Sequence, residues 1–331
     1  MIHSPLPRCA IIGAGLAGVT LARNLDAVAR VRIFEKSRGP GGRMSTRRHD
    51  NFSFDHGAQY FTARGQDFRR FLDPYINQGI IRPWETKFAT MGLDGKISDR
   101  EMTSTPWVAC PGMTGLVKAM AASLDCRHET GISRIRRKGS VWQLLDEDGV
   151  VHGEAEWVVT AVPARQAADL LPPEFGAKSA LARVRMLGCF TLMLGFEVPP
   201  SLPFGACFIE DQPVGFIAEN GTKPGGRRPG SLTVQARNTW AEDWLDAPQE
   251  AEKVMAEWLE DHLDIHVNEA VFSRFHRWRY ASVDTPLDAP FLCDDTLGLG
   301  AIGDWCIRGR VESAFDSAHA LSARMRKILG P

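Results

Sequence analysis

The stretch "IIGAGLAGVTLARNLDAVARVRIFEKSRGPGGRMSTRR", residues 11–48, decides the fold of this chain. The apolar residues 9–12 predict a buried strand, the alanine-rich residues 15–27 predict a helix packed on a sheet, and "VRIFEK" (31–36) predicts a second strand. These elements form a β-α-β unit of about 30 residues. Parallel strands with helical crossovers imply a doubly wound α/β domain.

Glycines mark the connection between the first predicted strand and the helix. Gly13, Gly15 and Gly18 form G-x-G-x-x-G, in which a bare backbone lets a pyrophosphate approach the helix N-terminus. Glu35 ends the second strand about 20 residues later, where a carboxylate accepts hydrogen bonds from both hydroxyls of an adenosine ribose. Three turn glycines with a surface glutamate are the alternative, but the strand-helix-strand context favours a dinucleotide site.

The residues after Glu35 bear on whether that dinucleotide is NAD or FAD. An NAD dehydrogenase usually continues into another β-α unit, whereas this chain continues with "KSRGPGGRMSTRR". Gly39, Gly41 and Gly42 allow close backbone approach, and Arg43 supplies a fixed cation beside a phosphate or a reduced ring. This pattern suits a cofactor that extends beyond the first pyrophosphate contact.

The composition of the whole chain favours small-molecule chemistry. A chain of 331 residues is long enough for two lobes, because single cores stop growing at roughly 250 to 300 residues. Its 39 basic and 40 acidic residues are nearly balanced, so we expect neither nucleic acid nor a membrane as a partner. Seven scattered cysteines without a C-x-x-C pair suit a cytoplasmic location. His262 and His266 lack a third ligand nearby, so no metal is expected.

Two further strands of the same sheet are predicted far along the chain. "EWVVTAVP" (156–163) and "LGLGAIGDW" (297–305) read as apolar strands, and residues 310–329 carry apolar side chains at helical spacing. The first N–H groups of that helix, around Val311 and Glu312, form a site for the negative charge that a reduced flavin carries. An ordinary amphipathic closing helix is the alternative. Because residues 156–163 and 297–305 lie far along the chain from the first β-α-β unit, the domain is expected to be discontinuous.

The segments between these strands predict a second lobe with a mixed sheet. Residues 84–99 predict a hairpin, residues 185–200 a strand, and residues 248–263 a helix. The turn-rich residues 221–230 predict an exposed loop, in which Arg227 and Arg228 are weaker candidates for phosphate binding.

Six motifs spread over residues 11–315 carry a family resemblance. They are "GAGLAG" (13–18), "FEKSRGPGGRMSTRR" (34–48), "FDHGAQYFTAR" (54–64), "PGMTGLVKAM" (111–120), "HRWRYA" (276–281) and "GDWCIRGRVESAF" (303–315). On these motifs the chain resembles the renalase-like flavoproteins, within the wider flavin amine oxidase group. The first and last motifs occur in many FAD enzymes, whereas "DHGAQYFTAR" is much narrower.

The resemblance implies an α/β fold in which a Rossmann-type FAD-binding domain, a doubly wound parallel sheet, is joined by a mixed-sheet α+β substrate domain. FAD is expected to bind without a covalent link, with Asp304 holding ribityl hydroxyls. The expected FAD-binding domain comprises residues 1–65, 106–172 and 288–331, and the substrate domain comprises residues 66–105 and 173–287. The expected cofactor contacts are Gly13, Gly15, Leu16, Ala17, Gly18, Glu35, Lys36, Gly42, Arg43, Met44, Gln59, Tyr60, Ile132, Gly303, Asp304, Arg310, Val311, Glu312 and Ala314.

The motif "HRWRYA" predicts a strand with two different faces. His276, Trp278 and Tyr280 would share one face, and Arg277 and Arg279 the other. A polar-aromatic face suits a flat ring stacked against flavin, and a strand with its aromatics in the core explains the pattern equally well. The resemblance places Gln59 and Tyr60 near the flavin ring, so the catalytic candidates are Gln59, Tyr60, His276, Trp278 and Tyr280.

The resemblance implies oxidation of misformed dihydronicotinamide dinucleotides, 2- or 6-dihydro-NAD(P), to NAD(P)⁺. Hydride passes to flavin N5, and O2 then reoxidises the flavin and leaves hydrogen peroxide. Such chemistry depends on orientation over the ring more than on an acid-base pair. The alternatives are a flavin amine oxidase acting on a small amine and a non-enzymatic dinucleotide-binding redox sensor. The ring isomer and the choice of NAD or NADP stay open, and a monomer or homodimer is expected.

Overall fold

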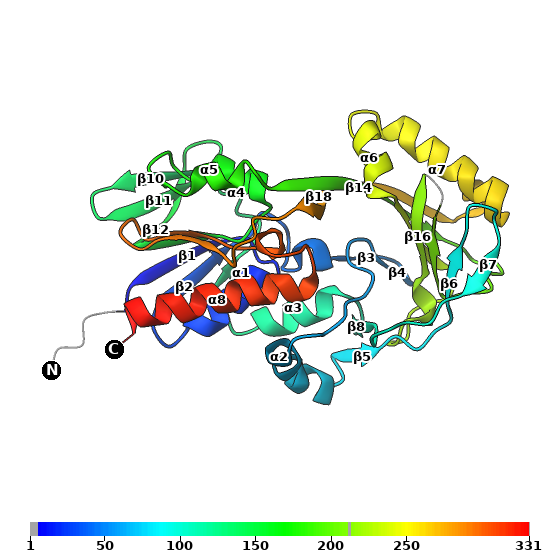
Figure 1. The fold of residues 1–331 in the computed structure, drawn as a ribbon, viewed down its shortest axis with the longest axis horizontal. Helices are drawn as coiled ribbons and strands as arrows, with labels where there is room; N and C mark the ends of the chain where they lie inside the picture. Colours follow the sequence, from blue (N-terminus) through cyan, green and yellow to red (C-terminus); the bar gives the residue numbers. More distant parts are fainter. Residues whose placement is uncertain (1–5, 211–212, 331) are drawn as a thin grey trace. The chain divides into compact units, whose positions relative to one another are not determined.

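The computed structural model describes residues 6–210 and 213–330, and the chain divides into two compact units. The first unit comprises residues 1–42, 117–186 and 283–331, and the second comprises residues 43–116 and 187–282. Each unit is therefore assembled from segments that are distant in the sequence, as the colours of Figure 1 show.

A six-stranded sheet in the order β19-β20-β13-β1-β2-β9 forms the centre of the first unit. The strands are parallel to their neighbours except for the antiparallel pair β19 and β20, which confirms the predicted doubly wound sheet. The strand order reverses at β1, and sheets of this kind bind ligands beyond the carboxyl ends of the strands at such a switch point. The bounds are β1 Arg8–Ile12, β2 Arg30–Phe34, β9 Cys126–Arg127, β13 Trp157–Thr160, β19 Leu292–Asp294 and β20 Leu299–Ala301.

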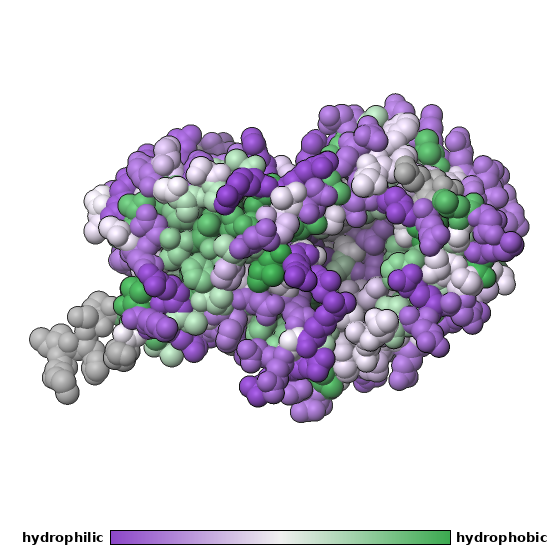
Figure 2. All heavy atoms as spheres, in the orientation of Figure 1, coloured by the Kyte–Doolittle hydropathy of each residue, from purple (hydrophilic) through white to green (hydrophobic). Residues whose placement is uncertain are grey.

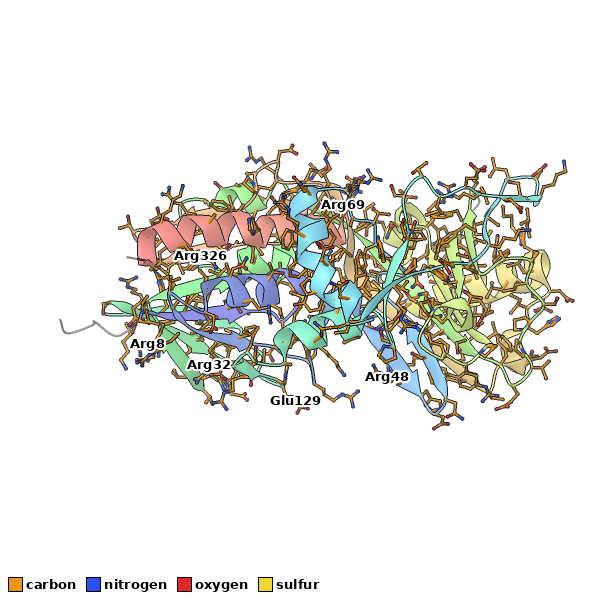
Figure 3. The ribbon with its side chains drawn as sticks, turned by 90° about the horizontal axis from the view of Figure 1, so that it is seen from below. Arg8, Arg32, Arg48, Arg69, Glu129 and Arg326 are labelled. Atoms are coloured by element: carbon orange, nitrogen blue, oxygen red, sulfur yellow. The ribbon has the colours of Figure 1, made fainter. Side chains whose placement is uncertain are left out.

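Helices α1 (Leu16–Leu25) and α8 (Val311–Leu329) lie side by side in the first unit (Figures 1 and 3). Asn24 Nδ2 donates to Ser322 Oγ at 3.2 Å, and Arg326 Nε donates to Asn24 O at 2.7 Å. A separate core joins the sheet to other elements through residues such as Trp142, Val158 and Ala167. Those elements are α4 (Ala164–Leu170), α5 (Lys178–Leu181) and the antiparallel strands β10 (Arg134–Lys138), β11 (Val141–Leu145) and β12 (Val151–Ala155).

The second unit is built on a seven-stranded sheet in the order β18-β14-β17-β16-β15-β6-β7. Strands β15 and β6 are parallel, whereas β14-β17, β17-β16, β16-β15 and β6-β7 are antiparallel, so the predicted mixed sheet and the predicted hairpin β6-β7 are confirmed. The bounds are β6 Phe88–Met91, β7 Ile97–Asp99, β14 Arg185–Gly195, β15 Ala206–Ile209, β16 Val214–Glu219, β17 Ser231–Ala236 and β18 Phe272–Thr285.

Helices cover one face of this second sheet. Leu192, Ile217 and Val234 of the sheet share a core with Met255 and Leu259 of the predicted helix α7 (Pro248–Leu263). The outer surface of α7 is mostly hydrophilic (Figure 2), as expected of an amphipathic helix. The remaining elements are α2 (Gln66–Asn77), α3 (Thr114–Ala121), α6 (Asn238–Trp244), and the strand pairs β3 (Thr46–His49) with β4 (Phe52–Asp55) and β5 (Ile81–Pro83) with β8 (Trp107–Ala109).

The compact units and the domain ranges expected from the sequence divide the chain at different residues. Residues 43–65 and 106–116, expected in the FAD-binding domain, group with the second unit, and residues 173–186 and 283–287 group with the first. Within the described ranges, no helix has both the length and the apolar character that crossing a membrane requires.

Candidate functional site

Three glycines shape the turn between β1 and α1, and each has different surroundings. Gly13 has a φ of +108°, which L side chains rarely adopt. A Cβ atom on Gly18 would lie 2.1 Å from Gly13 O, so glycine is what allows the helix to pack on the turn. Apart from its own chain neighbours, no atom of the described residues would lie within 4 Å of a Cβ atom on Gly15. Gly15 therefore leaves open space at the N-terminus of α1, where a pyrophosphate can reach the backbone.

The Glu35 carboxylate is buried beside this turn. Only 7% of the residue is exposed, and it directly follows β2. Oε2 accepts a hydrogen bond from Ala14 N–H at 2.8 Å, and Oε1 accepts one from Ser37 N–H at 2.8 Å. Each carboxylate oxygen keeps a further lone pair. This placement fits the predicted ribose ligand.

The glycine-rich loop after Glu35 lies against the β1-α1 turn. Gly41 N–H donates to Ala14 O at 2.9 Å, and a Cβ atom on Gly42 would lie 3.3 Å from Gly15 Cα. A side chain at position 42 would therefore be tightly packed, and the φ of +54° also favours glycine there. Arg43 follows within a short 3-10 helix (Gly42–Met44), and its Nη1 donates to Ala281 O at 3.3 Å.

The N-termini of α1 and α8 lie at the same edge of the sheet, because each helix follows the carboxyl end of a parallel strand, β1 or β20. The positive ends of two helix dipoles therefore lie at one edge of the sheet, which favours an anionic group there. Asp304, on the segment between β20 and α8, and Glu312, in the first turn of α8, are buried, with exposed fractions of 6% and 8%.

The other predicted cofactor contacts of the first unit lie on the same few segments. Leu16 and Ala17 are buried in the first turn of α1, and Lys36 is exposed after Glu35. Thr130 N–H donates to Glu35 O at 2.9 Å, which brings the segment containing Ile132 beside Glu35. Gly303, Arg310, Val311 and Ala314 lie on or beside the connection to α8. Their contacts with a cofactor stay a prediction.

The alternation predicted for "HRWRYA" is confirmed in β18 of the second unit. The rings of His276 and Trp278 lie 4.5 Å apart, centroid to centroid, and they lie 5.1 and 5.3 Å from the ring of His56. Arg277, on the opposite face, donates from Nη1 to Leu245 O at 2.6 Å. We call His56, His276 and Trp278 the polar-aromatic cluster. Sequence reasoning missed His56, although it follows Asp55 in the narrow motif at 54–64.

The segment 55–61, here called the motif turn, runs over the face of the sheet that carries this cluster. His56 O accepts a hydrogen bond from Trp278 Nε1 at 2.8 Å, and Gly57 O accepts one from Gln235 Nε2 at 2.7 Å. The Tyr60 ring contacts aromatic rings of β6 and β16 at 5.9 and 6.3 Å. The turn therefore joins several strands of the sheet.

Tyr280, the third residue predicted on the polar-aromatic face of β18, is half-buried.

Asp55, at the start of the motif turn, is the centre of a buried ion cluster. Its Oδ2 pairs with Lys223 Nζ at 3.0 Å and with Arg227 Nη1 at 2.7 Å, and these three side chains are at most 1% exposed. Its Oδ1 accepts hydrogen bonds from Thr46 Oγ1 at 2.6 Å and from Met113 N–H at 2.9 Å. One carboxylate thus connects three segments that are far apart in the sequence.

The prediction that residues 221–230 form an exposed loop is wrong for Lys223 and Arg227, because both residues are buried. The attraction of Asp55 holds both cations inside the unit, so Arg227 does not serve as an exposed phosphate ligand. Glu219 also closes the loop, because its Oε1 accepts three backbone N–H groups, those of Gly221, Gly230 and Ser231.

Burial determines the charges of the polar-aromatic cluster. It lowers the pKa of His56 to about 4, with further lowering by His276 and Arg47. Burial also lowers the pKa of His276 to about 4, together with the positive charges of Arg47 and Arg274. Both imidazoles are therefore neutral near pH 7.

In the ion cluster, burial alone would raise the pKa of Asp55, but Lys223, Arg227 and the hydrogen bonds lower it to about 2. Burial lowers the pKa of Lys223 to about 8, although the charge of Asp55 opposes this change. Asp55 is therefore an anion at neutral pH, and Lys223 is mostly a cation.

Two family descriptions match the chain. Residues 11–75 match "NAD(P)-binding Rossmann-like domain", and residues 63–320 match "Flavin containing amine oxidoreductase". The second match covers more than half of the chain, begins just after the motif turn, and includes the ion-cluster cations, β18 and the start of α8.

Solved structures share this fold over nearly the whole chain. A proposed protoporphyrinogen oxidase from Exiguobacterium sp. 255-15 is 12% identical, with a TM-score of 0.79, covering 97% of this chain and 99% of that one. Cyclohexylamine oxidase from Brevibacterium oxydans IH-35A is 14% identical, with a TM-score of 0.74, covering 99% and 100%. Putrescine oxidase bound to putrescine is 13% identical, with a TM-score of 0.67, covering 98% and 99%. At these identities the similarity concerns the fold.

Proposed function

This chain belongs to the flavin-containing amine oxidoreductase family, and from that membership we propose that it is an FAD-dependent oxidase of misformed dihydronicotinamide dinucleotides. The proposed substrates are 2- or 6-dihydro-NAD(P), and the proposed products are NAD(P)⁺ and hydrogen peroxide. Bound FAD would supply the hydride acceptor. The renalase-like motifs of the sequence support this choice within the family.

The first unit has residues that fit FAD held without a covalent link. Glu35 would bind the adenosine ribose, and the open backbone at Gly15 would receive the pyrophosphate. The N-terminus of α8, around Val311 and Glu312, would stabilise negative charge on a reduced flavin. Asp304 would bind ribityl hydroxyls. These roles match the chemistry of each position, since the carboxylates accept hydrogen bonds from hydroxyls and the backbone N–H groups donate to anions.

The observation that carries the proposed substrate is the uncharged polar-aromatic cluster. Trp278 and His276 offer flat surfaces for a nicotinamide ring, and the ring of His56, in the motif turn, packs against both. A dihydronicotinamide ring becomes positively charged when it loses hydride. Imidazoles that stay neutral near pH 7 do not repel that charge, whereas imidazolium groups would.

Oxidation of a small amine is the second candidate, and family membership favours it. An amine substrate must first lose a proton, because alkylammonium groups have a pKa of about 10. An imidazole with a pKa of about 4 is a poor base for this step, since the transfer is uphill by about six powers of ten. The cluster therefore suits a substrate that releases hydride without prior deprotonation.

Anaerobic mixing of the purified protein with candidate substrates tests the proposal. We expect 2- or 6-dihydronicotinamide dinucleotides to bleach the flavin absorbance far faster than 4-dihydro NADH or simple amines. A displacement of about 1 Å at the reacting carbon can cost on the order of 10²-fold in rate, so the correct isomer should stand out. If 4-dihydro NADH or a primary amine reduces the flavin as fast, the proposed substrate is wrong and a general oxidase activity replaces it.

Neighbouring residues on the two faces of β18 provide a matched control. Trp278→Leu should slow flavin bleaching at least tenfold, because it removes a stacking surface. Arg279→Leu changes an exposed residue on the opposite face and should leave the rate within about twofold of the wild type. Both variants should retain FAD like the wild type.

A further inference from the structure

Both N–H donors of the Gln59 side chain are used within the second unit. Its Nε2 donates to Asp55 O at 2.5 Å and to Gly57 O at 3.3 Å, and its Oε1 accepts a hydrogen bond from Lys223 Nζ at 3.1 Å. A carboxamide has two N–H donors, and both point back at the motif turn. Gln59 therefore binds the turn itself, and its amide has no donor left for a cofactor or a substrate.

Lys223 determines the orientation of this carboxamide. Its ammonium has three N–H groups, of which one reaches Gln59 Oε1 and one reaches Asp55 Oδ2 at 3.0 Å. The Nζ atom also lies 4.8 Å from the centre of the Trp84 ring, at cation-π distance. An ammonium can only donate, so it holds the oxygen of the amide toward itself and the nitrogen toward the turn.

Arg227, the second cation of the ion cluster, differs from Lys223 in its partners. Its Nη1 binds Asp55 and, at 3.2 Å, Asn220 Oδ1. Its Nε and Nη2 atoms are buried and have no hydrogen-bond partner among the described residues. Lys223 and Arg227 thus both neutralise Asp55, but the contacts of Lys223 extend to the amide that closes the motif turn.

We propose that Lys223 is a positioning residue which, through the Gln59 carboxamide, holds the motif turn in place so that His56 and Tyr60 keep their positions on the sheet. His56 contacts both other members of the polar-aromatic cluster, and Tyr60 packs on β6 and β16. Loss of the amide contact frees the turn between its anchors. The link from this role to catalysis rests on the proposed function.

Three variants separate positioning from simple stabilisation. Lys223→Met removes the amide contact and one cation, Arg227→Met removes the other cation, and Gln59→Met removes the amide while keeping every ion. Each lysine or arginine variant leaves Asp55 one cationic partner. We expect Lys223→Met and Gln59→Met to lower the limiting rate of anaerobic flavin reduction at least about tenfold with unchanged FAD content, and Arg227→Met to lower it less than threefold.

A double-mutant cycle tests whether Lys223 acts through Gln59. If it does, the double variant should be no slower than Gln59→Met alone, because residues in one contact network are not additive. Rates that multiply in the double variant, or an equal loss in Arg227→Met, would overturn the proposal and leave Lys223 a stabilising ion only. If Lys223→Met does not fold, the rate of Gln59→Met compared with that of Arg227→Met still tests the proposal.

Amide hydrogen exchange tests the positioning role of Lys223 in the absence of any substrate. Backbone amides of residues 56–61 should exchange at least tenfold faster in Lys223→Met and Gln59→Met than in the wild type or in Arg227→Met. Wild-type exchange in Lys223→Met would overturn the positioning role. If the wild-type flavin is not reduced by any dihydronicotinamide, the proposed function fails, and the exchange rates still decide whether Lys223 holds the turn.

Discussion

Glu35, the predicted ribose ligand, has both of its carboxylate oxygens held by the surrounding backbone. Its two carboxylate oxygens accept N–H groups from both sides, one from the β1-α1 turn and one from the following loop. The carboxylate is therefore already oriented before any ligand binds. An oriented acceptor loses little side-chain entropy on binding, which favours affinity.

Exchange of Glu35 for alanine should weaken FAD binding at least tenfold. Charge-assisted hydrogen bonds to the ribose contribute roughly 1.5 to 3 kcal/mol each, and about 1.4 kcal/mol corresponds to a factor of ten. Flavin fluorescence during titration of the FAD-free protein measures the dissociation constant. The dissociation constant of Glu35→Gln should lie between those of the wild type and Glu35→Ala, since glutamine keeps one acceptor oxygen. Equal retention of FAD in wild type and Glu35→Ala would mean that the adenosine lies elsewhere.

At the scale of elements, the β1-α1 turn combines two requirements within six residues. Gly18 allows the helix to pack on the strand, because a Cβ atom there would overlap Gly13 O. Gly15 has open space instead, and its φ of −77° is accessible to any residue. The same residue type thus allows close packing at one position and leaves open space at the other.

These surroundings predict opposite results for two alanine variants. Gly18→Ala should lower the free energy of unfolding by about 1 to 3 kcal/mol, since the backbone must shift to relieve the overlap. Gly15→Ala should leave the unfolding of the FAD-free protein nearly unchanged and weaken FAD binding, because its methyl group enters the open space. Urea unfolding and FAD titration separate the two effects. A Gly15→Ala protein that binds FAD normally would show that the pyrophosphate does not approach there.

At the scale of the whole molecule, buried ionisable groups link stability to pH. His56 and His276 have pKa values of about 4 in the folded chain, below the ordinary value of 6.5. The unfolded chain therefore binds more protons than the folded chain between these values. Stability from these neutral imidazoles is complete above pH 6.5 and is lost as the pH falls toward 4. The pKa of Asp55 is lowered to about 2. The stability that its ionised carboxylate contributes is therefore lost only at lower pH, as the pH falls toward 2.

Acid titration of stability checks this linkage. The free energy of unfolding in urea should fall between pH 6.5 and 4, and in His56→Leu the slope should be smaller by up to about 1.4 kcal/mol per pH unit, because one proton fewer is taken up. His49→Leu replaces an exposed histidine and serves as the control. Equal slopes in wild type and His56→Leu would contradict the lowered pKa.

Several elements could be predicted from the sequence, because their causes are local. The β-α-β unit of residues 8–34, the hairpin β6-β7, helix α7 and the two faces of β18 all follow from apolar periodicity and turn residues. The G-x-G-x-x-G spacing and Glu35 likewise predicted a dinucleotide site whose geometry fits. Each of these signals lies within a short window of the chain, where backbone preferences and side-chain spacing act directly.

Only the tertiary structure decided how distant side chains meet. Lys223 binds Asp55 across 168 positions of sequence, and Trp278 binds His56 O across 222. A turn rich in glycine, proline and arginine predicts exposure, because isolated cations are costly to bury. A carboxylate from another segment offsets that cost here. The sequence by itself therefore determined the parallel sheet and its dinucleotide turn, whereas long-range packing decided the buried ion cluster and the partners of His56, because such pairings leave no periodic trace in the chain.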